Sequence, residues 1–332
     1  MSKFEPTPYL IAEMACAHEG SVERACALID AAAGAGVDAV QIQIYSTADL
    51  VVPQHHLYEL LGRIELSPAR WQEVTAHARR HRIDLLACVY DLPSLAVAER
   101  LGVDGLKLNS SDLSHPQMLA AAAASGMPFT LGTGASTWAE IDAALEVCRA
   151  HGARDLVLMH GVQDFPTAVE AARLQRVAAL RTRYSLPVGY QDHTDAGDPF
   201  ARVVDLVALG LGATVLEKHI TLDRLERGID HEAALEPDEL SGWVSTVRTG
   251  WAVLGDDAVE LTASDLRYRA FQKKNIVAAR DIAEGQRIES EMLVFLRAGH
   301  GLLPTEAHTL VGRTAARGIR AFEPVELADV GD

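Results

Sequence analysis

Short runs rich in β-branched and aromatic residues alternate with longer segments of helical period over the first three quarters of the chain. This alternation predicts βα units around a parallel sheet. The segment 21–36, for example, has apolar residues at spacings of three and four and ends in glycine, as helices often do. Eight runs are predicted to be strands: YLIAEMAC, AVQIQIY, DLLACVY, GLKLNS, PFTLGTG, DLVLMHG, PVGYQDH and TVLEKHI.

Eight such units in about 250 residues predict a closed (β/α)8 barrel, the TIM barrel of the α/β class. An open doubly wound sheet is the structural alternative, but it would scatter the polar strand ends along one edge. In the barrel, functional side chains lie at the carboxyl ends of the strands. The residues at those positions are therefore the candidates for catalysis and binding.

The pattern changes after a final barrel helix, where a polar segment ends near Lys274. The remaining residues form short apolar runs interrupted by glycine and charge, which predicts a small β-rich domain. We expect a barrel over residues 1–262, a linker over 263–274 and a C-terminal domain over 275–332. Because a core of fewer than about 70 residues is thin, this domain is expected to pack against another surface.

Composition indicates an ordinary soluble globular protein, with 48% hydrophobic and 23% charged residues among 332. No apolar run is long enough to span a bilayer, and the N-terminus lacks a secretory pattern, so we expect no membrane partner and a cytoplasmic location. The net charge of −16 argues against nucleic acid as a partner. The cysteines show no CxxC spacing and are expected to be reduced and mostly structural: Cys16, Cys26, Cys88 and Cys148.

Two neighbouring predicted strands, the seventh and eighth, end in histidine. A barrel would place His193 and His219 together at its rim, where two imidazoles can share a metal ion. With only two protein nitrogens the ion would keep positions for water and substrate oxygens, which suits Mn²⁺ or Mg²⁺ acting as a Lewis acid. The alternative is that each histidine only hydrogen-bonds within the rim.

Other strand ends are polar beyond what stability requires. Buried charge is costly unless it is paired or used, so Glu13 in an apolar strand favours a function. Lys107 and Ser110, at the end of the fourth predicted strand, are candidates for a function for the same reason. Glu217 precedes Lys218, for which a structural ion pair is equally plausible.

Three further features carry weaker signals. The stretch LGTGAS, with Thr133, offers backbone amides before a helix and is a weak phosphate-cradle pattern. The segment 223–240 holds Arg227, Asp230 and His231 in a long loop that either folds over the site or is a solvated charged loop. Lone histidines after strands, such as His18, are more often structural than ligands. His160 belongs to the same class.

Several motifs resemble those of the sialic acid synthases, which condense phosphoenolpyruvate with an N-acylated amino sugar. IAEMACAHEG is similar to the opening IAE…NH.G segment of that family, LPVGYQDHT to GYSDHT, LEKHITLDR to EKHFTLDR and GIDHEAALEPDEL to GPDH.ASLEPDEL. FPT after LMHG is similar to YPT, and FLRAGHG in the tail is similar to an RPG.G element. The resemblance spans nearly the whole chain. It implies that the tail is an antifreeze-like (SAF, β-clip) domain.

The resemblance also implies roles for individual residues. His193 and His219 would bind the divalent metal, with Mn²⁺ expected and Mg²⁺ or Co²⁺ as alternatives, and Glu13 would lie near the reacting sugar. Lys107 and Ser110 would hold the phosphate. Asp230 would bind sugar hydroxyls, and Arg297 would reach the acyl group in the barrel of a partner subunit, within a domain-swapped homodimer. Further substrate-binding positions are expected at Gln41, Thr133, Gln163, Gln191 and Glu217.

The departures from the family pattern lie mostly at anion contacts. The family usually has lysine where this chain has Gln41, threonine at Cys88, and serine at Gly132 and Gln191; Phe165 replaces the tyrosine of YPT. Each charge-assisted hydrogen bond lost is worth about 1.5–3 kcal/mol. The leading hypothesis is a metal-dependent synthase that condenses phosphoenolpyruvate with an amino sugar or related aldehyde. The alternatives are a barrel aldolase or lyase with another donor, and a non-catalytic sugar-binding protein.

Overall fold

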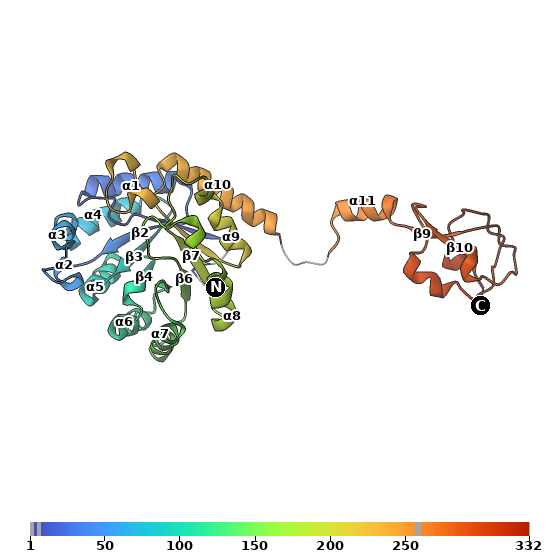
Figure 1. The fold of residues 1–332 in the computed structure, drawn as a ribbon, viewed down its shortest axis with the longest axis horizontal. Coiled ribbons are helices and arrows are strands. Elements are labelled where there is room, and N and C mark those ends of the chain that lie inside the picture. The colour runs from blue at the N-terminus through green and yellow to red at the C-terminus, as the bar shows by residue number, and fades with distance from the viewer. Residues whose placement is uncertain (1–2, 5–7, 256–259, 332) are drawn as a thin grey trace. The chain divides into compact units, whose positions relative to one another are not determined.

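The computed structural model describes residues 3–4, 8–255 and 260–331. The chain divides into two compact units, Met1–Gly255 and Asp256–Asp332. Within the described part of the first unit, eight parallel strands close in chain order into a barrel (Figure 1). The predicted (β/α)8 barrel is confirmed, and the open sheet is excluded. The strands are β1 (Tyr9–Glu13), β2 (Ala39–Ile44), β3 (Asp84–Val89), β4 (Gly105–Leu108), β5 (Phe129–Gly132), β6 (Leu156–His160), β7 (Val188–Asp192) and β8 (Val215–His219).

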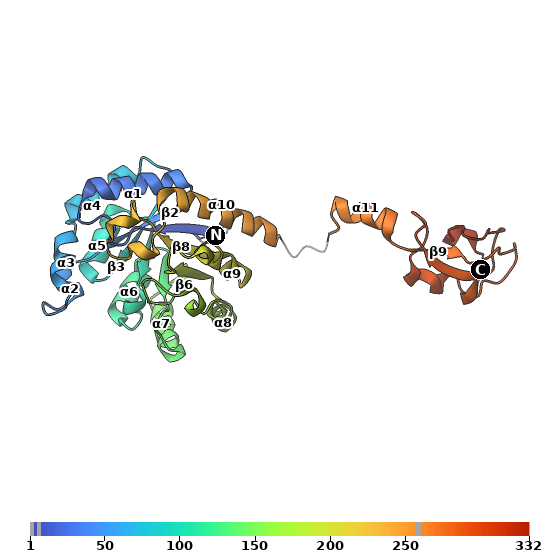
Figure 2. The same cartoon turned by 45° about the horizontal axis from the view of Figure 1, so that its top comes forward.

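Helices surround the strands, as both views show (Figures 1 and 2). The first of them begins after Ser21, whose hydroxyl accepts a hydrogen bond of 3.2 Å from the Arg24 amide, and ends at Gly36 with φ 83°. The helices of this unit are α1 (Val22–Ala35), α2 (Thr47–Leu50), α3 (Tyr58–Ile64), α4 (Pro68–Ala78), α5 (Leu92–Leu101), α6 (Pro116–Ala124), α7 (Trp138–Ala150), α8 (Gln175–Tyr184), α9 (Val204–Gly210) and α10 (Pro237–Leu254).

The interior of the barrel has an apolar layer and a polar layer. Apolar side chains from the amino-terminal parts of several strands form one buried cluster, which includes Tyr9, Ile11 and Val215. Toward the carboxyl ends the buried positions become polar, with Glu13, Gln41 and Glu217 at most 1% exposed. Since side chains alternate along a strand, these residues point inward and their chain neighbours point toward the helices.

Lys218 illustrates the outward-pointing set. Its ammonium donates hydrogen bonds to Asp192, to Asp205 Oδ2 at 3.2 Å and to the Ala201 carbonyl at 2.9 Å. The indole N–H of Trp243 donates to the same Asp205 oxygen at 2.8 Å. This buried network joins β7 and β8 to α9 and α10, so the ion-pair interpretation of Lys218 is confirmed.

The second unit is small and has its own apolar core, which includes Ile276, Ile288 and Leu310. Its strands β9 (Asn275–Ala278) and β10 (Leu293–Leu296) pair antiparallel, and isolated bridges extend the β structure. The helix α11 (Ala263–Gln272) lies within the segment predicted as a polar linker. A capping box starts it: the Thr262 hydroxyl accepts from the Asp265 amide, and the Asp265 carboxylate accepts from the Thr262 amide.

Along the chain, the boundary between the two units follows Gly255, whereas the barrel was expected to extend to residue 262. The linker prediction overlooked α11, in which the apolar Leu266, Tyr268 and Phe271 are interspersed with polar and charged residues, and none of these side chains is buried. Across the described residues, no helix combines the length and hydropathy needed to cross a membrane.

Candidate active site

A cluster of buried polar side chains fills the carboxyl end of the barrel. Lys107 from β4 donates to Glu217 from β8 and lies 3.9 Å from Glu13 Oε2. The Gln41 amide, from β2, donates to Glu13 and also to Glu217 Oε2 at 3.3 Å. Glu13 Oε1 accepts from the Ala15 amide at 2.7 Å. One lysine therefore lies between two carboxyl groups, and a neutral amide lies beside both.

This arrangement shifts the ionisation of Glu13. Burial raises its pKa to about 8; the Lys107 ammonium opposes that rise and the Glu217 carboxylate adds to it. Burial alone would lower the pKa of Lys107, but Glu217 and Glu13 raise it above its ordinary value. Near neutral pH these shifts favour a protonated Glu13 beside the Lys107 ammonium.

The two predicted metal ligands lie together at the ends of adjacent strands. The rings of His193 and His219 have centroids 5.3 Å apart, and both are 4% exposed. Burial lowers the pKa of both imidazoles, strongly for His219, and the Lys107 charge lowers both further. His193 Nδ1 lies 2.7 Å from the Val162 carbonyl, to which it donates, so Nε2 is left with a lone pair. Both rings are therefore neutral, as metal ligation requires.

Phe165 covers this histidine pair. Its ring centroid lies 4.2 Å from that of His193 and 6.1 Å from that of His219, and 42% of the residue is exposed. The position that carries tyrosine in the similar motif thus presents an apolar ring to the imidazoles.

The loops after β4 and β5 approach each other closely. The Gly134 amide donates to the Ser110 hydroxyl at 3.1 Å, and the Thr133 hydroxyl donates to the Met159 carbonyl at 3.0 Å. A Cβ added at Gly132 would lie 2.7 Å from the Ser110 amide nitrogen. Glycine replaces the expected serine here because the Ser110 backbone occupies the space.

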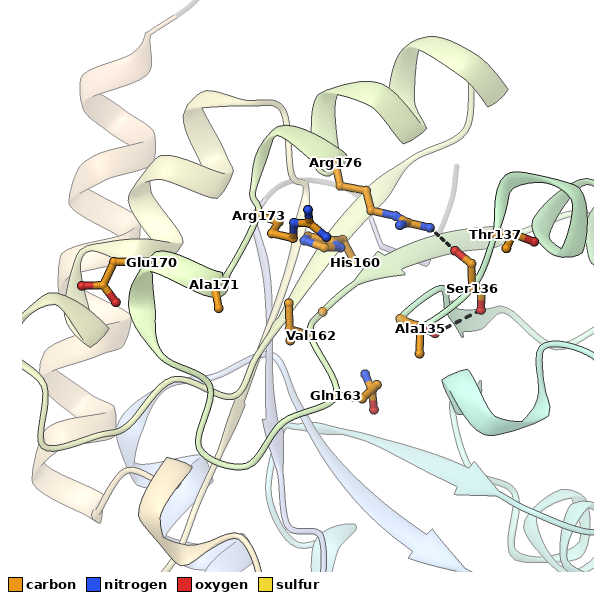
Figure 3. Close-up of a pocket in the computed structure, with 12 residues that line it drawn as sticks. Ala135, Ser136, Thr137, His160, Val162, Gln163, Glu170, Ala171, Arg173 and Arg176 are labelled. Atoms are coloured by element: carbon orange, nitrogen blue, oxygen red, sulfur yellow. Dashed lines mark hydrogen bonds between the residues drawn. The ribbon is translucent and has the colours of Figure 1, made fainter.

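A pocket of about 660 Å³ opens next to these loops, at the carboxyl ends of β5 and β6 (Figure 3). Arg173 and Arg176 line one side, and the Arg176 guanidinium donates to the Ser136 carbonyl. The ring of His160 is buried there: Nε2 bonds the Ala172 carbonyl at 2.9 Å, and Nδ1 has no partner in the part of the chain that the structure describes. The amide nitrogen of Gln163 likewise finds no hydrogen-bond partner within residues 3–4, 8–255 and 260–331. The pocket thus offers two guanidinium groups and unused polar atoms.

The remaining predicted residues lie in different surroundings. Gln191 is 1% exposed in β7, and its side-chain oxygen has no partner among the described residues. Asp230 has a left-handed backbone with φ 62°, and burial raises the pKa of its carboxyl to about 6. His18 packs edge-on against Trp71, at 5.4 Å between centroids. Arg297 is exposed in the second unit, just after β10.

Sequence reasoning missed Gln43, Arg173 and Arg176. The Gln43 amide donates to Glu13 Oε1 at 3.1 Å. Its signal was the alternation of glutamines at positions 41 and 43, which places both on one face of a strand. The arginines lie at and before the start of α8, where nothing in the sequence distinguishes them from solvated charges.

Comparison with known proteins agrees with this geometry. An uncharacterized protein of Methanocaldococcus jannaschii is 31% identical over 91% of this chain and 88% of its own length. The N,N'-diacetyllegionaminic acid synthase of Legionella pneumophila is 29% identical over 95% of this chain and 92% of its own. The crystal structure of the N-acetylneuraminic acid synthetase of Leptospira borgpetersenii, in complex with citrate, has a TM-score of 0.74 at 29% identity, covering 80% of this chain and 92% of that one.

Residues 28–259 match the NeuB family, and residues 274–331 match the SAF domain. The first match covers most of the barrel, including Gln41, Lys107, His193 and Glu217. The chain therefore belongs to the NeuB family and ends in a SAF domain.

Proposed function

We propose that this protein is a nonulosonic acid synthase that condenses phosphoenolpyruvate with an N-acylated amino sugar or a related aldehyde. The observation that carries the proposal is the pair of neutral imidazoles, His193 and His219, beside the Lys107–Glu217 pair. Two relatives named as legionaminic acid and N-acetylneuraminic acid synthases support the same reaction class.

The histidine pair suits a divalent cation. Both rings are neutral, and the Val162 carbonyl fixes the orientation of His193, as the partners of metal-ligating histidines commonly do. Two nitrogen ligands leave coordination positions open, which favours Mn²⁺, Mg²⁺ or Co²⁺. When bound, such a cation supplies Lewis-acid polarisation of a carbonyl oxygen.

Glu13 and Lys107 supply the remaining chemistry in this proposal. Glu13 Oε1 accepts hydrogen bonds from Ala15 and Gln43, and Oε2 accepts from the Gln41 amide, so the carboxyl is held in one orientation. When protonated, this carboxyl can donate its proton to the alkoxide that develops when the donor carbon attacks the aldehyde. Lys107 holds a fixed positive charge next to the same site, as an anionic donor requires.

The pocket lined by Arg173 and Arg176 compensates for the neutral Gln41. Gly134 lies close to both regions, because its amide donates to the Ser110 hydroxyl and a Cβ added at Gly134 would lie 2.7 Å from the Gln163 amide nitrogen. Guanidinium groups bind phosphate and carboxylate with paired hydrogen bonds, so this pocket is a place for an anionic substrate group.

The direct test is a pair of single variants, His193→Ala and His219→Ala, assayed for release of inorganic phosphate from phosphoenolpyruvate with Mn²⁺ and a panel of N-acylated amino sugars. We expect each variant to lose at least about 100-fold in kcat, since a lost metal ligand removes the Lewis acid. Circular dichroism should show an unchanged fold. Full turnover in both variants would rule out the metal assignment.

A second candidate is an aldolase or lyase that uses another donor, such as pyruvate. The bond of Gln41 to Glu13 favours it, because an amide occupies the place of a cation that the family directs at an anion. If no acceptor in the panel elicits phosphate release, while aldehyde and pyruvate are consumed together, this second reaction replaces the first.

A further inference from the structure

A second group of metal-binding side chains lies on the outer helices, apart from the barrel interior. Nε2 of His77 is 2.6 Å from Asp30 Oδ1, and Nε2 of His81 is 2.7 Å from the same oxygen. The two imidazole rings have centroids 5.5 Å apart and are tilted by 51°. Three potential ligand atoms thus converge within 4.8 Å of one another.

The elements that carry these residues are well defined. Asp30 lies in α1, His77 lies in the last turn of α4, and His81 follows the end of that helix. Because the chain leaves α4 to enter β3 at Asp84, the end of α4 lies near the amino ends of the strands. The active-site cluster lies at the opposite ends, so the two sites are separate.

We propose that Asp30, His77 and His81 form a second, structural cation site that binds Zn²⁺ or a similar transition-metal ion and joins α1 to the end of α4. Two imidazoles and one carboxylate are ligands that Zn²⁺ accepts, with water in the remaining position. The side chains of both histidines are about a quarter exposed, at 21% and 30%, so the ion can enter from solvent while the rings stay partly fixed.

The geometry requires only a small adjustment. Ligand atoms around a tetrahedral Zn²⁺ with bonds of about 2.0–2.1 Å lie roughly 3.3 Å apart. The present separations of 2.6 and 2.7 Å between each Nε2 and Asp30 Oδ1 are those of hydrogen bonds, so each nitrogen needs to move away from this oxygen by well under 1 Å. Half of the Asp30 side chain is exposed, at 52%, which leaves room for that movement.

The chain offers a matched control. His55 and His56 form another exposed histidine pair, stacked with centroids 4.5 Å apart. No carboxylate cluster with metal-ligand spacing includes them among the described residues. Removal of a histidine from that pair should leave high-affinity metal binding unchanged.

The test counts metal ions. Metal-free full-length protein carrying His193→Ala and His219→Ala, which empties the active-site pair, is titrated with Zn²⁺ by calorimetry. We expect one ion per chain, and addition of His77→Ala or His81→Gln should weaken binding at least about tenfold, since even outer-shell partners are worth that much. Adding His56→Ala should change nothing.

Two further readouts separate this site from a loss of fold. Co²⁺ should give visible absorption bands that disappear with His77→Ala, and Zn²⁺ should raise the melting temperature only while the three ligands are intact. Circular dichroism of each variant reports folding. The proposal is overturned if the active-site double variant binds no Zn²⁺, or if binding survives both His77→Ala and His81→Gln.

Discussion

Gly132 stands where the family usually has serine, and the loop that carries Ser110 lies directly against it. A serine at this position would bring its Cβ to 2.7 Å from the Ser110 amide nitrogen, a separation that real side chains do not adopt. The approach of the Ser110 loop therefore excludes the serine that the family usually carries. The loop after β5 is hydrogen-bonded to the loop after β4 through the Gly134 amide, which donates to the Ser110 hydroxyl.

We expect Gly132→Ser to destabilise the protein by about 1–3 kcal/mol, because the backbone has to move to admit the side chain. Chemical denaturation measures this difference. Gly242→Ser is the matched control: no heavy atom lies within 4 Å of a Cβ there, and serine is a better helix former than glycine. Equal stability of Gly132→Ser and the parent protein would show that the Ser110 loop shifts without a cost in free energy, contrary to this prediction.

Asp230 gives a pH-dependent prediction. Burial raises the pKa of its carboxyl to about 6, above the ordinary value of 3.8, so the folded state favours the protonated form. Near pH 4 and below, the folded protein buries a neutral Asp230 carboxyl, so this group does not lower the free energy of unfolding. As the pH rises through about 6, the buried carboxylate forms and stability is lost. The thiol of Cys16 lies close enough for Asp230 to help raise its pKa, although burial is the larger cause.

Asp230→Asn should therefore be more stable than the parent at pH 8 by about 1–2 kcal/mol, a range reduced for the partial contact of the carboxyl with water. The difference should vanish near pH 4. Asparagine also tolerates the left-handed backbone at this position. Denaturation curves across this pH range provide the measurement, and a pH-independent difference would contradict the assignment. If Asp230 binds sugar hydroxyls, the same variant should raise KM for the acceptor.

At the scale of elements, the alternation of side chains along β8 divides its residues between two tasks. Glu217 and His219 point into the barrel, whereas Lys218 points outward to Asp192 and Asp205. The outward network holds the end of β8 against α9 and α10. The position of the histidine pair therefore depends on an ion pair on the other face of the same strands.

We expect Lys218→Met to destabilise the protein by about 3–5 kcal/mol, because two buried carboxylates lose their only ammonium partner among the described residues. Adding Asp205→Asn should restore part of the loss by removing one of those charges. Thermal and chemical unfolding measure both effects. Arg183→Met, which breaks the exposed pair with Asp142, should have a much smaller effect. A similar loss in both lysine and arginine variants would refute the argument.

At the scale of the whole molecule, each unit has its own apolar core. The resemblance to sialic acid synthases predicts that Arg297 of the SAF domain completes the site of a partner subunit. The polar character of the chain before β9 and the small size of the domain motivated that prediction. The arginine is exposed, as a residue that acts on another subunit needs to be.

The in-trans role can be tested by mixing a His193→Ala subunit with an Arg297→Ala subunit, each nearly inactive alone. In a domain-swapped heterodimer one site collects both changes and the other collects none, so activity should recover to about half of the parent level per heterodimer. If each site is built within one chain, every site keeps one change. No recovery after verified subunit exchange would then exclude the in-trans role.

The sequence alone determined the barrel, its strands and the inward placement of Glu13, Lys107, His193 and His219. These follow from short-range rules: strand runs and helical periods repeat along the chain, and parallel strands bring their carboxyl ends together. The motif resemblance determined the family. The helix α11 was not predicted: a linker was expected over its segment, and its apolar residues Leu266, Tyr268 and Phe271 remain exposed.

Tertiary structure alone decided which partner each charge has. Lys107 and Lys218 both occupy buried strand positions, but one bonds Glu217 inside the barrel and the other bonds carboxylates outside it. The approach of Asp30 to His77 and His81 joins residues 47 and 51 positions apart in the chain. Contacts of this kind depend on how helices pack around the closed sheet, and local patterns along a single chain do not encode those distances.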